Sequence, residues 1–184
     1  FDLHWTPRRC LPRSEALILR LAPHGVRVAG PADVVRQARL LRCLGSLGVP
    51  VPRVRWSGSE TSYFGTPFHV VERVAGRTFG LDEPDGTRGM GDVDAVGRDA
   101  IRCLAELHRL DPASAASVLD EPLDLHADIE RWDRFVERAG DPALVVDVPG
   151  LRSALCARIP RAPRVGILHG DYQWSNLLVR DQQI

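Results

Sequence analysis

The first half of the chain alternates between short apolar runs and one longer segment with apolar residues every three or four positions. The runs are bounded by Gly and Pro, which is typical of strands, and they lie at 17–21, 51–56 and 68–74, with 51–56 expected at a sheet edge. The longer segment predicts a helix that opens at Pro31 and ends at Gly48, a residue suited to the left-handed turn after a helix. Turn-forming residues at 80–92 predict a surface loop.

The second half of the chain predicts mainly helices. Helical spacing favours helices at 92–110, 127–139 and 150–158. In the middle helix we expect a core-facing side made of Ile129, Trp132, Phe135 and Val136. Brief apolar runs at 165–168 and 177–179 predict two further strands, and Asp181-Gln182 after them predicts a hairpin turn. Strands with one helix, followed by mostly helices, indicate an α+β fold in two lobes.

Composition and charge narrow the classes of protein. The chain has 184 residues, 44% of them hydrophobic and 26% charged, as in an ordinary globular protein. A formal net charge of +0 argues against a nucleic-acid partner, which needs clustered excess cations. No apolar run approaches the roughly 20 residues that span a bilayer. No signal peptide is recognisable at the start, so we expect a cytoplasmic protein without a membrane partner.

Two features of the residue usage bear on the chemistry. All 24 basic residues are arginines, so a side-chain cation that contacts phosphate in this chain must be an arginine. The 4 cysteines are widely spaced, which favours reduced thiols over a metal or disulfide framework. The chain starts without Met, which suggests a fragment or a trimmed protein.

The segment LHGDYQWSN at 168–176 carries the clearest chemical signal. Asp171 and Asn176 stand five positions apart in a loop between two short apolar runs. A carboxylate suits the orientation of an attacking hydroxyl group, and an amide oxygen is a hard, neutral ligand for Mg²⁺. Protein kinases separate these two residue types by the same interval. Asp and Asn are also common loop residues, so the pair by itself fits an ordinary surface loop as well.

The wider stretch LHGDYQWSNLLV resembles the catalytic loop of the aminoglycoside phosphotransferase/choline kinase-type family, whose signature is H-G-D-x-x-x-x-N after a strand. Further segments resemble other parts of that family in the same order: LILRLAP, VVRQARLLRCLGSLGVPVPRV, GTPFHVVERVAGRTF and LAELHRLDP. The resemblance covers most of residues 15–184. It implies a protein-kinase-like two-lobed fold that is C-terminally truncated, with a small β-rich N-lobe at 1–74 and a mostly helical partial C-lobe at 75–184.

Within the loop at 168–176, the resemblance implies one role for each matching residue. Asp171 matches the catalytic base, and Asn176 matches a Mg²⁺ ligand. His169 matches a residue that braces the loop. The family's second metal-binding Asp is expected after Ile184, and Asp181, a turn residue, is not expected to replace it.

The resemblance also implies a nucleotide site in the N-lobe. Arg20 stands where a strand lysine contacts the α- and β-phosphates, and Val71, Glu72 and Val74 match the hinge whose backbone meets adenine. We expect the Glu72 side chain to be solvated. Gln37 stands where a glutamate often pairs with the strand cation, and an amide supplies no charge to orient Arg20. A glycine-rich loop over the phosphates is not recognisable in residues 1–16.

The resemblance therefore implies a phosphotransferase that moves the γ-phosphate of ATP, or of GTP, to a hydroxyl group of a small molecule, with Mg²⁺ as cofactor. Aminoglycosides, choline-like amino alcohols, sugars and hydroxyacyl thioesters are all open as substrates, and the substrate pocket is expected to involve the helices near 127–139. We expect this 184-residue chain to be an inactive fragment by itself. The alternatives are a nucleotide-binding pseudokinase and a non-catalytic module.

Overall fold

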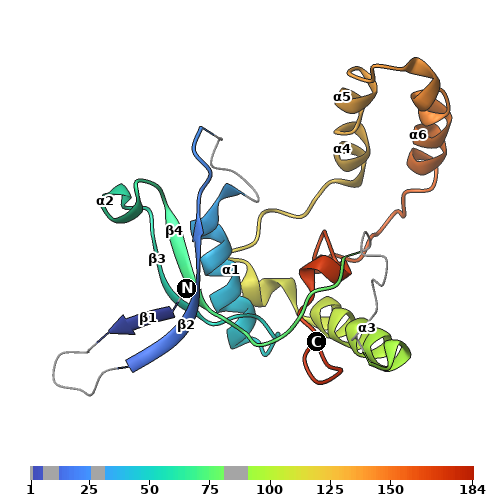
Figure 1. The fold of residues 1–184 in the computed structure, drawn as a ribbon. Helices are drawn as coiled ribbons and strands as arrows, with labels where there is room; N and C mark the ends of the chain where they lie inside the picture. The colour runs from blue at the N-terminus through green and yellow to red at the C-terminus, as the bar shows by residue number, and fades with distance from the viewer. Residues whose placement is uncertain (1, 6–12, 26–31, 81–90) are drawn as a thin grey trace. The chain divides into compact units, whose positions relative to one another are not determined.

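The computed structural model describes residues 2–5, 13–25, 32–80 and 91–184 (Figure 1). These residues fall into two compact units, Phe1–Leu119 with Gly166–Ile184, and Asp120–Val165. The predicted helix start at Pro31 and most of the predicted loop at 80–92 lie outside the described residues. The predicted lobe boundary at residue 74 stays a prediction. Among the described residues, no helix is long and apolar enough to cross a membrane.

The first unit contains a four-stranded antiparallel sheet in the order β1-β2-β4-β3. The strands are β1 (Asp2–Trp5), β2 (Arg13–Leu21), β3 (Val54–Gly58) and β4 (Phe68–Glu72). The strands predicted in the first half of the chain are thus confirmed, and β3 lies at the sheet edge, as expected. Strand β4 lies between β2 and β3, and its first four residues are buried, which is what a continuous apolar run predicts.

Side chains alternate between the two faces of the sheet because successive residues of a strand point to opposite sides. On one face, Leu17, Phe68 and Val70 form a buried cluster with Leu19 packed against it. A short helix, α2 (Thr61–Phe64), brings the Phe64 ring edge-on to the Phe68 ring at a centroid distance of 4.8 Å. The sequence pattern did not predict α2.

Helix α1 (Val34–Ser46) packs on the other face of the sheet. Asp33 caps this helix by accepting a hydrogen bond from the Arg36 N–H at 2.8 Å. Val34 and Ala38 are the buried residues of α1. The buried His69 of β4 lies beside them, with its Nδ1 2.7 Å from the Val34 carbonyl oxygen. A carbonyl only accepts, so Nδ1 carries the proton that links β4 to α1.

Helix α3 (Val93–Arg109) confirms the helix predicted at 92–110. Its buried residues, Val96, Ala100 and Leu107, form a stripe along one side. Val93, which the sequence placed in the same stripe, is 42% exposed. The stripe matters because the C-terminal part of the chain lies against it, as the red segment beside α3 shows in Figure 1.

Two clusters hold the C-terminal part of the chain to α3. In the first, Phe79 is 2% exposed and packs with Val96 and Val179. The backbone of Arg77 pairs with that of Val179 through two hydrogen bonds, of 3.0 and 2.9 Å. The second cluster joins Leu107 and Ile167 to Ala115, which lies in a 3-10 turn after α3, Pro112–Ala115.

The second unit is helical, but its helices differ from those predicted. The single helix expected at 127–139 is interrupted and forms α4 (Leu125–Glu130) and α5 (Asp133–Val136). The expected core-facing side is wrong for Trp132 and Phe135, which are 54% and 53% exposed. This unit buries few side chains, so large rings remain at its surface. Helix α6 (Val148–Cys156) agrees with the helix predicted at 150–158, and a 3-10 turn, Pro142–Val145, precedes it.

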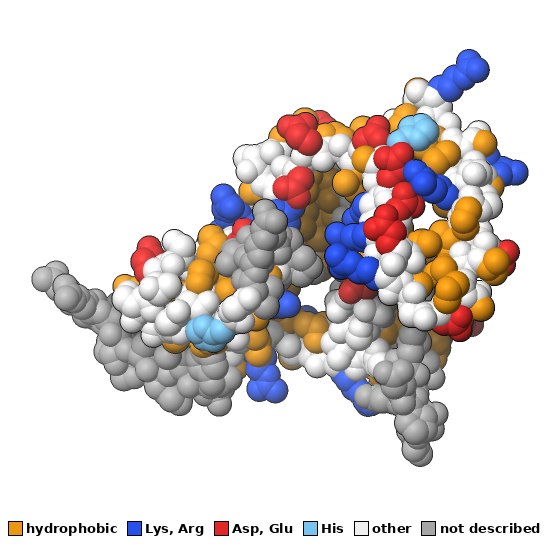
Figure 2. Space-filling view, turned by 90° about the horizontal axis from the view of Figure 1, so that it is seen from above, with side chains coloured by type: hydrophobic (Ala, Val, Ile, Leu, Met, Phe, Trp, Pro, Cys, Tyr) orange, Lys and Arg blue, Asp and Glu red, His pale blue; other side chains and the backbone are white. Residues whose placement is uncertain are grey.

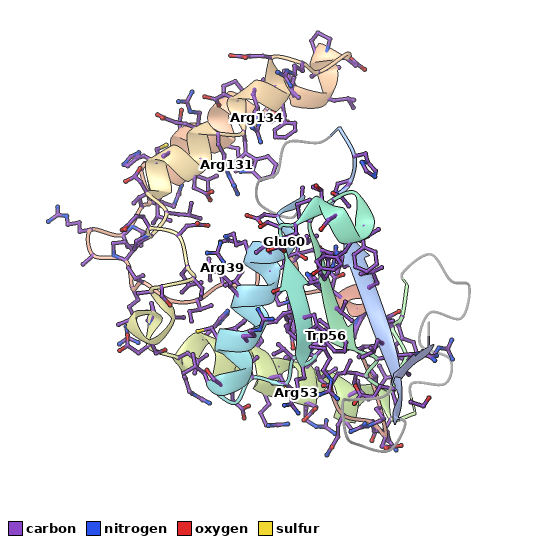
Figure 3. The ribbon with its side chains drawn as sticks, turned by 90° about the vertical axis from the view of Figure 1, so that its left-hand side faces the viewer. Arg39, Arg53, Trp56, Glu60, Arg131 and Arg134 are labelled. Atoms are coloured by element: carbon purple, nitrogen blue, oxygen red, sulfur yellow. The ribbon has the colours of Figure 1, made fainter. Side chains whose placement is uncertain are left out.

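The exposed rings of the second unit are covered in part by arginines. The Arg131 guanidinium lies 5.2 Å from the centroid of the Trp132 ring, and Arg134 lies 4.9 Å from that of Phe135 (Figure 3). The Trp132 and Phe135 ring centroids are 5.4 Å apart. Over the described residues on the face in Figure 2, acidic and basic side chains are interspersed, without a broad area of one sign.

The end of the chain forms a tight turn. Asp181 and Gln182 both have positive φ, 51° and 62°, as in the two-residue turns of hairpins. The backbones of Arg180 and Gln183 exchange hydrogen bonds of 2.9 Å across this turn. The predicted hairpin turn is therefore confirmed. The predicted strand at 165–168 is wrong: the segment is irregular, and of its apolar residues only Ile167 is buried.

Phe79 supplies a test of the packing between α3 and the C-terminal segment. We expect Phe79→Ala to lower the free energy of unfolding by about 3–5 kcal/mol, because truncation of a buried aromatic leaves a cavity. Leu144→Ala is the control, because Leu144 is 81% exposed and an exposed truncation changes the free energy by only about 0.5 kcal/mol. Urea unfolding measures both, and similar small effects of the two variants would contradict this packing.

Asp99 supplies a test of pH dependence. Its carboxylate accepts the Ile184 N–H at 2.9 Å, and this bond, followed by those from Arg102, lowers the pKa of Asp99. A carboxylate with a lowered folded pKa stabilises the protein above its unfolded pKa of about 3.9 and loses that effect as the pH falls through the folded pKa. We therefore expect Asp99→Asn to lower the free energy of unfolding at pH 7. The difference in this free energy between the variant and the original protein should shrink below about pH 4. Urea unfolding at several pH values, with the exposed Glu121→Gln as control, measures this; a difference that is constant with pH would contradict it.

Candidate functional site

The loop at 168–176 begins with a sharp change of chain direction. Ile167 anchors its start in the cluster with Leu107 and Ala115. Gly170 has φ of +82°, a backbone conformation that favours glycine because it has no Cβ. A short 3-10 turn, Trp174–Asn176, ends the loop, and the Phe79 N–H donates to the Trp174 carbonyl at 3.3 Å. Asp171 therefore lies on a bend that is fixed at both ends.

Asp171 and Asn176 are joined directly. The Asn176 Nδ2 donates to the Asp171 carboxylate Oδ2 at 2.7 Å and to the Asp171 backbone carbonyl at 3.0 Å. Both residues are exposed. Since the amide nitrogen faces Asp171, the amide oxygen is the atom that Asn176 turns away from it. Within the described parts of the chain, Asp171 forms no ion pair with an arginine or histidine.

His169 lies inside the same hydrogen-bonded loop. Its Nδ1 accepts the Asp171 backbone N–H at 3.3 Å, which requires a lone pair on that nitrogen and hence no proton there. Its ring meets the Tyr172 ring edge-on, with centroids 5.2 Å apart. Through these contacts His169 links Asp171 to Tyr172, and the bracing role that the resemblance implies for it stays a prediction.

Tyr172 is a residue of the site that sequence reasoning missed. Its hydroxyl donates to the backbone carbonyl of Ala100 in α3 at 2.6 Å. Burial raises the pKa of the Tyr172 phenol, and the nearby Cys103 and Asp99 raise it further, so the group stays protonated as a donor. The sequence contains no pattern that would indicate a contact between Tyr172 and Ala100, which are 72 residues apart.

Arg20 and Gln37 lie in the sheet and helix of the same unit. Arg20 is exposed on β2, directly opposite His69 of β4. Burial lowers the pKa of His69, and the charges of Arg20 and Arg42 lower it further against the opposing effect of the bond to Val34. Gln37 is half-buried, one position before the buried Ala38, so it lies at the edge of the helix face that covers the sheet.

The predicted hinge residues differ in what their backbones are free to bind. Val71 pairs with residues of both neighbouring strands. The Glu72 N–H donates to the Arg53 carbonyl at 3.0 Å. Its side chain is half-buried, and one carboxylate oxygen accepts the Arg53 N–H at 2.9 Å in an exposed hydrogen bond, so the Glu72 side chain is solvated only in part. Figure 3 shows Arg53 at the start of β3. Val74 follows the strand, and within the described residues its backbone N–H has no recorded hydrogen bond.

The structure thus gathers the predicted residues in two groups. His169, Asp171 and Asn176 share one hydrogen-bonded loop, and Arg20, Gln37 and the hinge belong to the sheet and the helix that covers it. Among the residues the structure describes, no group of three or more His, Cys, Asp or Glu side chains could hold a metal ion. The oxygens available to Mg²⁺ at the loop are those of Asn176 and Asp171, and such hard oxygen donors fit that ion.

Gly170 supplies a test of the loop geometry. A Cβ at Gly170 would meet no atom within 4 Å, so the cost of Gly170→Ala comes from the backbone alone. We expect it to lower the free energy of unfolding by about 1–2 kcal/mol, the cost of a left-handed conformation for a residue with a Cβ. Gly97→Ala is the matched control, because Gly97 lies in α3, also with nothing near its Cβ, and alanine there stabilises by about 0.5–1 kcal/mol. Equal effects of the two substitutions would contradict the positive φ of Gly170.

Comparisons with solved structures identify the fold. A crystal structure of a Ralstonia eutropha protein, provisionally named an aminoglycoside phosphotransferase, matches with a TM-score of 0.70 and 21% sequence identity. The match covers 100% of this chain and 56% of that chain. At this identity the likeness concerns the fold, and it agrees with the mixed helix-and-sheet architecture that the sequence predicted.

Comparisons with curated proteins give longer relatives. The chain is 33% identical over 179 residues to acyl-CoA dehydrogenase family member 11 of Rattus norvegicus, and 25% identical over 174 residues to family member 10 of Mus musculus. These matches cover 92% and 91% of this chain but 22% and 16% of the relatives. The chain therefore spans about a fifth of the length of the curated relatives it matches. The profile of the phosphotransferase enzyme family matches residues 5–184, nearly the whole chain, and the chain belongs to that family.

Proposed function

We propose that this chain carries the catalytic loop of a kinase that transfers the γ-phosphate of ATP to a hydroxyl group of a small molecule. The observation that carries the proposal is the direct link between Asp171 and Asn176, with Nδ2 to Oδ2 at 2.7 Å. It holds a carboxylate, which forms no ion pair with the described residues, and an outward amide oxygen together on one exposed bend. These are the two oxygen donors that phosphoryl transfer requires at an acceptor hydroxyl and a metal ion.

Asp171 would act on the acceptor. Its carboxylate accepts a hydrogen bond from the substrate hydroxyl and so directs the oxygen lone pair at the γ-phosphorus. As the new O–P bond forms and the bond from the γ-phosphorus to the oxygen of ADP breaks, the hydroxyl proton passes to the Asp171 carboxylate and then to water. The link to Asn176 limits rotation of the carboxylate during this step.

The remaining predicted residues would hold the nucleotide. When bound, Mg²⁺ neutralises charge on the phosphates. We assign the amide oxygen of Asn176 as the ligand that this chain supplies to Mg²⁺. Arg20 would place a permanent positive charge near the α- and β-phosphates, since a guanidinium stays protonated. Of the hinge residues, Val74 is the one whose backbone has left the sheet, so we assign the adenine contact first to Val74. The same backbone contact would accept guanine, so GTP is a second candidate donor.

A binding module without transfer is the second candidate function, and Gln37 is the observation that favours it. A glutamate at this place would supply a negative charge to Arg20, whereas glutamine supplies only a dipole. The two functions differ in what happens after nucleotide binds: the kinase releases ADP and a phosphorylated acceptor, and the binding module releases unchanged ATP.

The names of the relatives, rather than the loop, support our choice of substrate class. Of the acceptors that the sequence leaves open, hydroxyacyl thioesters fit best a chain whose curated relatives are named as acyl-CoA dehydrogenase family members.

The proposed role of Asp171 predicts a specific loss. In the full-length protein, we expect Asp171→Asn to lower the rate of phosphate transfer from ATP by about a hundredfold or more, because an amide cannot take the hydroxyl proton. ATP affinity, measured by calorimetry, should stay within about threefold. Asp181→Asn is the matched control, because the Asp181 side chain is 92% exposed and asparagine tolerates its positive φ.

Two outcomes would count against the kinase. Transfer that survives in Asp171→Asn would remove Asp171 from the reaction. ATP binding with no transfer to any hydroxyl compound, in the full-length protein without substitutions, would favour the binding module.

A further inference from the structure

The segment from 167 to 179 follows the buried stripe of α3 in reverse order. Ile167 packs with Leu107, the Tyr172 hydroxyl reaches the carbonyl of Ala100, and Val179 packs near Val96. Helix positions 107 and 100 are two turns apart, about 10 Å along the axis. The loop is thus laid along α3 with three points of attachment, one of which is a hydrogen bond.

The hydrogen bond differs from the other two attachments in that it has a direction. Apolar contacts hold the segment against α3 but tolerate rotation and small shifts, because burial is not directional. The bond from Tyr172 to the Ala100 carbonyl, at 2.6 Å, fixes both distance and angle. An interior helix carbonyl can take a second donor on its free lone pair. Ala100 is small and 5% exposed, which lets the phenol approach the helix backbone.

Tyr172 is also the neighbour of Asp171 in the chain and in space. Its ring contacts the His169 ring, and His169 accepts the N–H of Asp171. The link from Asn176 fixes Asp171 within the loop, but it does not fix the loop relative to α3. Gly170, just before Asp171, is a point about which the loop could turn.

We propose that Tyr172 is a positioning residue for the reaction proposed above: its hydroxyl bond to Ala100 sets the direction in which the loop presents the Asp171 carboxylate. The inference rests on the proposed function and adds a residue to it. Because the nucleotide contacts assigned to Arg20 and Val74 lie outside this loop, and only the metal ligand Asn176 lies within it, loss of this bond should lower kcat more than it changes KM for ATP. A residue that only stabilised the fold would lower the active fraction instead, with kcat per folded molecule retained.

Tyr172→Phe tests this role, because it keeps the ring that contacts His169 and removes only the hydroxyl. We expect kcat to fall by about three- to tenfold, the range that one hydrogen bond supplies, with KM for ATP within about twofold. Tyr172→Leu also loses the ring contact with His169, so its kcat should fall further. Tyr63→Phe is the matched control: Tyr63 is the other of the 2 tyrosines, 71% exposed, and its ring packs edge-on to Phe68.

A second readout does not depend on turnover. Hydrogen–deuterium exchange should show faster exchange over 168–176 in Tyr172→Phe, with α1 unchanged and with no such change in Tyr63→Phe. With 2 tyrosines in the chain, carbon-13 label on the tyrosine ring gives one signal for each, and the Tyr172 phenol should titrate above its ordinary range.

The outcomes separate this inference from the proposed function. Unchanged kcat, or a loss of kcat matched by an equal loss of folded protein, would overturn the positioning role. If the full-length protein transfers no phosphate, the proposed kinase fails, and loop exchange then decides whether Tyr172 orders the loop: faster exchange in Tyr172→Phe supports that part and unchanged exchange overturns it.

Discussion

The contact between the buried stripe of α3 and the segment 167–179 is the constraint on which the candidate site depends. The loop that carries Asp171 has little regular structure, and a bend at Gly170 runs through it. Such a loop holds a defined shape only if a rigid element supports it, since fixing each residue otherwise costs about 1–2 kcal/mol of conformational entropy. Helix α3 is that element: Leu107 and Val96 bury the ends of the segment, and the Ala100 carbonyl receives Tyr172 between them. Residues 77–79 also hold the end of this segment in place, because Arg77 pairs with Val179 and Phe79 is buried.

Local patterns predicted most of the first unit and the loop. Strands β2 and β4 and helices α1 and α3 were found because their apolar residues repeat at the strand or helix period, and the two-residue turn at Asp181 is encoded within a few positions. The strand expected at 165–168 failed because a run of apolar residues does not reveal whether a partner strand exists, and Ile167 alone is buried there. The helix expected at 127–139 failed because its apolar spacing assumed a core that the second unit does not supply to Trp132 and Phe135.

The candidate site shows the same division between local and distant information. His169, Asp171 and Asn176 are close in sequence, so a short motif predicted them, and the structure joins them by hydrogen bonds. Tyr172 was missed because its partner is a backbone carbonyl 72 residues away, and residue types alone do not indicate such a partner. The hydrogen bond of the Glu72 side chain was not predicted for a related reason: it depends on the register between β3 and β4, which sets Arg53 beside it. The catalytic assignment of the loop and the nucleotide contacts of Arg20 and Val74 stay proposals.

The proposed site is tested most directly by a crystal structure of the protein with Mg²⁺ and a non-hydrolysable ATP analogue. We expect the metal on the Asn176 amide oxygen, the γ-phosphate facing the Asp171 carboxylate across the space for an acceptor hydroxyl, and the Tyr172 bond to Ala100 intact. A nucleotide bound away from the loop at 168–176, or a loop that has left α3 while the nucleotide is bound, would contradict it.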